Sequence, residues 1–150
     1  MRLRDFFTDH ALAFGMDAET KDEVLAAVVS LLGLDERSTS TLLRLLHRRE
    51  NLGSTGVGRG IAIPHCRSTA VEELRLAYLG LAKPIEYQAA DQRPVEHVFL
   101  IVAPPVEVSN QYLPVLGRIA QFARDPDATA KLGGLRTPAD FYALLEAKQV

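Results

Sequence analysis

The chain has 150 residues, of which 47% are hydrophobic and 24% charged, as is typical of a globular domain that buries its own core. Its formal net charge of -2 at pH 7 argues against a nucleic-acid-binding protein held by bulk positive charge, although residues 44–49 form a basic group. The longest apolar run, 98–106, is interrupted by two prolines, so no membrane span is expected, and a single cysteine excludes an internal disulfide and a cluster of thiolate metal ligands.

The N-terminal segment does not have the form of a signal peptide. Asp5, Asp9 and His10 lie where such a peptide needs an uninterrupted apolar stretch. No repeat, low-complexity segment or linker divides the sequence. We therefore expect a cytoplasmic protein in which residues 1–150 form a single domain.

Two helices are predicted in the first third of the chain. Thr20 and Glu23 form a capping-box pattern, apolar residues follow at helical spacing, and Gly33 supplies the stop. Ser38 or Ser40 is expected to cap the second helix, which should end just before a run of glycines. The apolar stripe of this second helix consists of Leu42, Leu43, Leu45 and Leu46.

The glycine run belongs to the stretch GVGRGIAIPH, residues 56–65. It matches neither the GxxxxGK[ST] of a P-loop nor the GxGxxG that opens a helix in dinucleotide-binding folds, so no nucleotide site is expected. The alternating glycines predict a compact loop without shielding side chains, and residues 61–64 predict a short buried strand. Because Pro64 cannot donate to a sheet, we expect pairing to end there and His65 to be presented at the surface or in a shallow cleft.

Two longer strands are predicted in the middle of the chain. The apolar runs 74–82 and 98–103 suit strands that are covered on both faces. The polar stretch 84–94, which is rich in turn residues, is expected to connect them.

Three more helices are predicted in the last third. Ser109 or Asn110 is expected to cap the first of them, and Asp125-Pro126 and Thr137-Pro138 are expected to start the other two. The apolar residues expected on the first of these helices are Leu113, Leu116, Ile119, Ala120 and Ala123. Helices on either side of apolar strands predict an α/β sandwich with a central mixed β-sheet flanked by helices.

From the residues alone, two interpretations of His65 stay open: a site framed by glycines and a proline, or an ordinary surface or hydrogen-bonded histidine. His10, His47 and His97 lack such a frame and are expected to be structural or exposed. Cys66 is expected to be a small neutral filler, because neighbours in an extended strand point to opposite faces and His65 cannot readily activate it. No metal site is expected, since no set of ligands lies at suitable spacing.

The segment from Arg49-Glu50 through LGSTGVGRGIAIPH (52–65) resembles the signature of the enzyme IIA domains of the bacterial phosphotransferase system, in the fructose/mannitol family. Its wording is closest to the nitrogen-regulatory branch of that family. The likeness spans roughly residues 20–145. It continues through Pro84-Ile85, Asp91, Pro94-Val95, an apolar strand ending at Pro104, and the helix residues Leu113, Leu116 and Ala120.

The resemblance implies a phosphocarrier, a phosphotransferase component of sugar transport or nitrogen regulation. In the family the histidine of the PH motif, here His65, accepts a phosphoryl group from an HPr-type phosphocarrier protein and passes it to a IIB domain or uses it as a signal to a regulatory target. The family arginine maps onto Arg49, whose planar guanidinium can bind two phosphoryl oxygens. Thr55, Gly56 and Gly58 are expected to support the phosphoryl group through the unshielded loop. No cofactor or metal is implied, because the donor is itself a phosphohistidine.

Two positions depart from the family pattern. Tyr112 stands where many members carry a second histidine, and it either supports the phosphoryl group through its hydroxyl or simply packs. Cys66-Arg67 stand where a glycine usually follows the histidine, and Arg67 or Arg59 either supplies a compensating cation or is a solvated charge. These departures motivate a second hypothesis, a non-transferring regulatory or binding module on the same fold. A cysteine-dependent hydrolase using Cys66 is a third hypothesis with little behind it.

Overall fold

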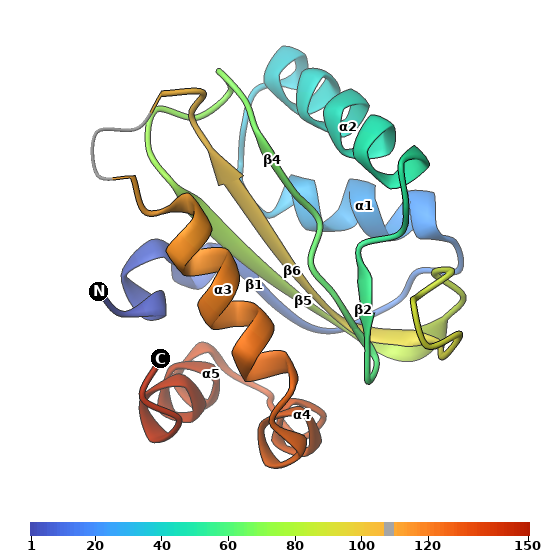
Figure 1. Ribbon diagram of the computed structural model, residues 1–150, viewed down its shortest axis with the longest axis vertical. Coiled ribbons are helices and arrows are strands. Elements are labelled where there is room, and N and C mark those ends of the chain that lie inside the picture. The colour runs from blue at the N-terminus through green and yellow to red at the C-terminus, as the bar shows by residue number, and fades with distance from the viewer. Residues whose placement is uncertain (107–109) are drawn as a thin grey trace.

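A mixed sheet of six strands forms the centre of the computed structural model, which describes residues 1–106 and 110–150 (Figure 1). The strand order is β1-β5-β6-β3-β2, and β4 pairs with β6 beyond the end of β3. The central pair, β5 and β6, is antiparallel, whereas β1 runs parallel to β5 and both β3 and β4 run parallel to β6. The strands are β1 (Leu12–Met16), β2 (Gly56–Gly58), β3 (Ile61–Ala62), β4 (His65–Arg67), β5 (Arg75–Ile85) and β6 (Val95–Ala103).

Helices cover both faces of the sheet, which confirms the predicted α/β sandwich. α1 and α2 lie against one face, and α3, α4 and α5 lie against the other (Figure 1). None of the described helices is long and apolar enough to cross a bilayer. The α-helices are α1 (Lys21–Ser30), α2 (Glu36–Asn51), α3 (Tyr112–Ala123), α4 (Pro126–Leu132) and α5 (Pro138–Ala147), and two short 3₁₀ turns span Leu3–Phe6 and Asp9–Ala11.

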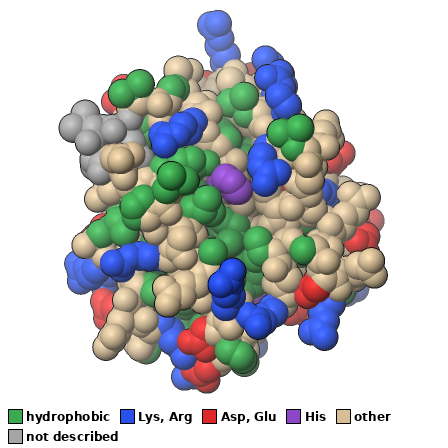
Figure 2. Space-filling view, viewed as in Figure 1, with side chains coloured by type: hydrophobic (Ala, Val, Ile, Leu, Met, Phe, Trp, Pro, Cys, Tyr) green, Lys and Arg blue, Asp and Glu red, His purple; other side chains and the backbone are tan. Residues whose placement is uncertain are grey.

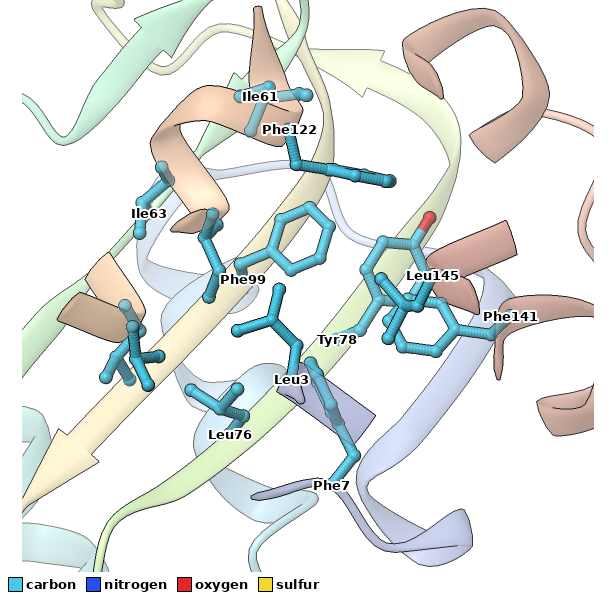
Figure 3. Packing of buried hydrophobic residues seen from close by; sticks show 14 of the residues in the cluster. Leu3, Phe7, Ile61, Ile63, Leu76, Tyr78, Phe99, Phe122, Phe141 and Leu145 are labelled. Atoms are coloured by element: carbon cyan, nitrogen blue, oxygen red, sulfur yellow. The ribbon is translucent and has the colours of Figure 1, made fainter. Parts of the chain in front are cut away.

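Two apolar cores result, one on each side of the sheet, and β6 contributes to both. Phe99 and Ile101 pack into the core under α3 to α5, whereas Val98 and Leu100 pack into the core under α1 and α2. A strand buried on both faces has apolar residues in an unbroken run, which is why 98–103 lacks alternation. Figure 3 shows the first of these cores, where Phe99 lies with Phe122, Tyr78 and Phe141.

Locally encoded helix ends are where the sequence places them. The Thr20 hydroxyl accepts from the Glu23 N–H while the Glu23 carboxylate accepts from the Thr20 N–H, so the predicted capping box is confirmed. Asp125 and Thr137 cap α4 and α5, each followed by proline in the first turn.

Two other predicted caps are wrong or fall elsewhere. α2 begins at Glu36 and is capped by the Asp35 carboxylate, which accepts from the Ser38 N–H, so Ser38 and Ser40 lie inside the helix. α3 has Gln111 at its cap position without a side-chain capping bond, Asn110 precedes it with φ 53°, and Ser109 lies outside the described residues. Leu113, expected on the apolar face of α3, is 68% exposed.

The predicted polar connection at 84–94 is partly wrong. β5 continues through Pro84 to Ile85, and Tyr87 and Ala89 are buried against the α1 and α2 side of the sheet. Tyr87 and Ala89 are buried because residues 54–56, which are distant in sequence, pack against them.

The glycine stretch is a strand pair rather than a loop. β2 pairs antiparallel with β3, with Gly56 opposite Ala62, and the chain then resumes pairing at His65, the first residue of β4. Pro64 lacks an N–H, but its carbonyl still accepts from the Ile101 N–H at 3.0 Å. Pairing with β6 therefore passes the proline, and the prediction that it ends at Pro64 is wrong.

Candidate functional site

The imidazole of His65 is oriented by a main-chain carbonyl. Its Nδ1 lies 2.7 Å from the carbonyl oxygen of Ile63, and the side chain is half-buried. A carbonyl oxygen only accepts hydrogen bonds, so Nδ1 carries the proton. In the neutral ring Nε2 then holds a lone pair and is the nucleophilic nitrogen.

The Ile63 carbonyl is itself held firmly. The Ile63 side chain is buried in the core, and its N–H donates to the carbonyl of Thr55 at 2.9 Å. On the other side, Pro64 is tied to β6 through Ile101. The orientation of His65 is therefore fixed by backbone that is paired on both sides.

A buried carboxylate links the end of α2 to this backbone. Glu50 accepts from the Thr55 N–H at 3.0 Å and from the Thr55 hydroxyl at 2.5 Å, and it pairs with the Lys21 ammonium at 2.9 Å. The Tyr87 hydroxyl lies 3.2 Å from the Thr55 hydroxyl, and Lys21 lies over the Tyr87 ring. Burial and the nearby Glu50 charge raise the pKa of Tyr87, so this hydroxyl stays protonated.

Glu50 is a residue that the chemistry of the sequence did not single out. It belongs to the family pattern, and a lone glutamate in the last turn of a helix resembles a solvent-facing charge. Its burial becomes evident only when α1, α2, β2 and the segment after β5 are brought together.

Arg49 lies beside Glu50 at the end of α2, which packs next to β4. Its Nη1 donates to the carbonyl of Gly53 at 2.8 Å, which holds the guanidinium against the turn that follows the helix. Because Glu50 is anchored inside, the helix end and the Arg49 backbone are fixed. The cation is thus supplied by an element in contact with the strand that carries His65.

Thr55 and Gly56 are close to the backbone that orients His65, but their polar groups are bonded within the protein. The Thr55 hydroxyl is part of the Glu50 network, and the Gly56 N–H donates to the Ser54 hydroxyl at 3.1 Å. A Cβ at position 56 would lie 2.6 Å from the Cβ of Ala89, so glycine is required there for close packing. These contacts favour a supporting role for both residues.

The structure does not bring Gly58 or Arg59 to His65. Gly58 has φ 104°, and the Arg59 side chain donates to the carbonyl of Arg124, which follows the last residue of α3. The His65 ring instead contacts Tyr112, the first residue of α3. Because a helix of 12 residues is about 18 Å long, the Arg59 guanidinium and the His65 ring lie at opposite ends of α3. This placement argues against the support expected from Gly58. For Arg59 it favours a loop charge over a cation that compensates at His65.

Tyr112 and Arg67, both flagged as departures, do lie beside His65. The Tyr112 ring is buried with its centroid 6.3 Å from that of the His65 ring. The guanidinium carbon of Arg67 lies 4.5 Å from the centroid of the Tyr112 ring, and Nη1 of Arg67 donates to the carbonyl of Pro104 at 3.1 Å. Three side chains that could interact with an anion therefore share one site.

Cys66 lies on the other side of the strand from His65. It packs against the core under α1 and α2, while His65 and Arg67 face α3. Burial raises the pKa of the Cys66 thiol to about 12, so the thiol stays protonated at neutral pH. A protonated thiol that faces away from the histidine is no activated nucleophile, which argues against the hydrolase hypothesis.

His97 and His47 have ordinary partners. His97 is buried with its Nδ1 2.8 Å from the Tyr78 hydroxyl, and burial lowers its pKa to about 4. His47 lies 3.5 Å from the carboxylate of Asp22 near the surface. Within residues 1–106 and 110–150, no group of three or more His, Cys, Asp or Glu side chains is placed to hold a metal ion.

One face of the molecule is apolar with flanking cations. On the face shown in Figure 2, hydrophobic side chains gather beside a histidine, Lys and Arg side chains lie on two sides of it, and Asp and Glu side chains lie toward the edges. Leu52 and Leu113 are 83% and 68% exposed and are close in sequence to Arg49 and Tyr112. Such a face suits docking of a protein that presents an anionic group.

Comparison with known proteins gives consistent matches. The family model described as "Phosphoenolpyruvate-dependent sugar phosphotransferase system, EIIA 2" matches residues 5–148. A nitrogen regulatory protein of Bradyrhizobium diazoefficiens is 34% identical over 90% of this chain and 86% of its own length. One from Pseudomonas aeruginosa is 31% identical over 97% of this chain and 95% of its own length. The crystal structure of nitrogen regulatory protein IIA-Ntr from Neisseria meningitidis superposes with a TM-score of 0.85 at 25% identity, over 94% of this chain and 97% of that one.

Proposed function

The chain belongs to the EIIA 2 family of the phosphoenolpyruvate-dependent sugar phosphotransferase system, and we propose that it is a phosphoryl carrier whose acceptor is Nε2 of His65. The hydrogen bond from Nδ1 to the Ile63 carbonyl carries this proposal. It selects the tautomer in which Nε2 has a lone pair. It also fixes the orientation of the ring, because the acceptor is a main-chain carbonyl rather than a solvent-exposed side chain.

The transfer needs no cofactor and no proton movement. The donor is a phosphohistidine on an HPr-type protein. Its P–N bond breaks as a P–N bond to Nε2 of His65 forms, and the donor imidazole leaves with the electron pair of the broken bond. The Nδ1 proton stays in place, and the Ile63 carbonyl stabilises the positive charge that the ring acquires.

Arg49 acts on the phosphoryl group in this proposal. Phosphorylation adds about two negative charges at neutral pH. A guanidinium on a helix that packs next to the strand carrying His65 is expected to stabilise both the product and the transition state. The Glu50 network keeps the end of α2 in position for this role.

The outgoing partner is proposed to be a regulatory protein target or a IIB domain. Two relatives that match most of the chain are named nitrogen regulatory proteins, which favours regulatory use of the phosphohistidine. The apolar face with flanking cations suits either class of partner.

Incubation with enzyme I, an HPr-type protein and phosphoenolpyruvate tests the proposal. We expect the chain to acquire acid-labile phosphate and to lose it when a IIB acceptor is added, or to change its affinity for a protein target. A folded chain that takes no phosphate but still captures a target protein would instead support the non-transferring regulatory module on the same fold.

A further inference from the structure

The position of Arg67 in β4 places it on the same face as His65. Side chains alternate along a strand, so residues two apart share a face and their Cα atoms are about 6.6 Å apart. The register with β6 agrees, because His65 pairs with Ile101 and Arg67 with Ala103, and both partners belong to the core under α3.

Contacts with Tyr112 and Pro104 hold the Arg67 guanidinium beside the histidine. It lies over the Tyr112 ring, which also lies beside the His65 ring, and it donates to the Pro104 carbonyl. Arg67 is nevertheless exposed to solvent, as a side chain that meets an incoming phosphoryl group must be. Stacking on an aromatic ring fixes the plane of the guanidinium and so reduces the entropy lost on binding.

We propose that Arg67 is a phosphoryl-binding residue of the phosphorylated protein, with Tyr112 as the residue that positions it. This inference rests on the proposed function, because it concerns the phosphoryl group on His65. Arg49, on α2, and Arg67, on β4, then contact this group from two different elements. Unlike a histidine in the Tyr112 position, a guanidinium is cationic at every physiological pH.

The pKa of the phosphoryl group itself gives a direct readout. The experiment follows the phosphorus NMR signal of the phosphorylated protein between pH 5 and 9, in the parent, in Arg67→Gln and in Arg67→Lys. A cation in contact with the group favours its dianion, so removing the cation raises the phosphoryl pKa. We expect an increase of about half a unit or more in Arg67→Gln, with Arg67→Lys in between.

Arg59→Gln is the matched control. Arg59 is also an exposed arginine whose Nη1 donates to a main-chain carbonyl, but it lies at the opposite end of α3. We expect this variant to titrate like the parent. The rate of phosphorylation by the HPr-type protein should fall about tenfold in Arg67→Gln, in line with loss of a charge-assisted hydrogen bond, and not in Arg59→Gln.

The outcomes separate the two proposals. If the parent is phosphorylated on His65 but Arg67→Gln has the same phosphoryl pKa and the same rate, Arg67 does not bind the group and only this inference fails. If the parent takes no phosphate, the proposed function fails, and this inference with it. A change in rate without a change in phosphoryl pKa would assign Arg67 to docking of the donor and overturn its role at the phosphoryl group.

Discussion

Nδ1 and Nε2 of His65 differ because the Ile63 carbonyl accepts from only one of them. The contact determines which nitrogen attacks phosphorus, and it does so through backbone that no side-chain substitution removes. The chemistry of the site therefore depends on the path of the chain between β3 and β4.

The tautomer of His65 is the first prediction. In the unphosphorylated protein above pH 8, long-range proton–nitrogen correlation spectra should show Nδ1 protonated and Nε2 unprotonated. His97, whose Nδ1 contacts a tyrosine hydroxyl that can donate or accept, is an internal comparison. A His65 ring protonated on Nε2 would contradict the orientation by Ile63.

Sequence reasoning reached His65 and Arg49 through a long motif, left open whether Arg67 is a compensating or a solvated cation, and did not single out Glu50. Both depend on distant pairing: Arg67 lies beside His65 because β4 continues along β6, and Glu50 is buried because Lys21 and Thr55 surround it. Gly58 shows the converse, since its place in the motif gave no sign that it lies at the far end of α3.

At the scale of elements, the β2–β3 strand pair and the end of α2 form the support beneath the histidine. β2 packs so closely on the segment after β5 that a single methyl group would not fit at Gly56. The Glu50 carboxylate joins the same strand to α1 and α2. Two predictions concern this support.

Gly56→Ala should destabilise the protein by about 1–3 kcal/mol, because its Cβ would lie 2.6 Å from that of Ala89 and backbone must shift to relieve the overlap. The control is Gly117→Ala, in α3, where a Cβ meets nothing within 4 Å. This variant should be more stable than the parent by up to about 1 kcal/mol, because alanine favours the helix more than glycine does. Urea unfolding measures both. Equal stability of the two variants would contradict the close packing of Gly56 against Ala89.

Thr55→Val should lower the free energy of unfolding by about 1–3 kcal/mol, because it removes the hydroxyl that donates to Oε2 of the buried Glu50 carboxylate. The Thr55 N–H and the Lys21 ammonium still bond Oε1 in this variant. Thr129→Val serves as control, since the Thr129 hydroxyl donates to a carbonyl at the surface and its loss costs little. The same unfolding experiment compares them. A Thr55 variant as stable as the Thr129 variant would show that the bond between the Thr55 hydroxyl and Glu50 does not stabilise the fold.

The helix ends show which elements a sequence can predict. The capping box of α1 and the Asp-Pro and Thr-Pro starts of α4 and α5 are determined within four residues, so local patterns find them. Local patterns do not find β2, because two of its three residues are glycines, which have a weak intrinsic preference for strands. The strand forms because it pairs with β3 and packs against Ala89.

The whole molecule is a sheet between two cores, and the face that we propose for partner binding combines three elements. β4 lies beside the start of α3 and packs against α2, and these three elements come from distant parts of the sequence. The fold class was predictable because continuous apolar runs and helices on both sides allow few arrangements. The strand order was not, because it depends on pairings between distant segments.

The core under α3 to α5 contains a titratable pair, His97 and Tyr78, and this predicts acid sensitivity of the entire fold. Burial lowers the pKa of His97 from 6.5 to about 4, so the unfolded chain binds a proton more readily than the native protein. The contribution to stability is complete above pH 6.5 and is lost as pH falls toward 4. We expect the free energy of unfolding to drop by up to about 3 kcal/mol over that interval.

Urea unfolding at a series of pH values measures this, with His97→Gln as the comparison. Glutamine can still bond the Tyr78 hydroxyl but does not titrate, so the variant should have a flatter dependence between pH 6.5 and 4. Parallel curves for the parent and the variant would assign the acid sensitivity to other groups.

The central claim, that His65 carries the phosphoryl group, is tested most directly by labelling two proteins side by side. The parent and His65→Ala are incubated with enzyme I, an HPr-type protein and labelled phosphoenolpyruvate, and acid-labile phosphate is measured over time. We expect the parent to be labelled and the folded His65→Ala variant to remain unlabelled. Equal labelling of the two proteins would contradict the account.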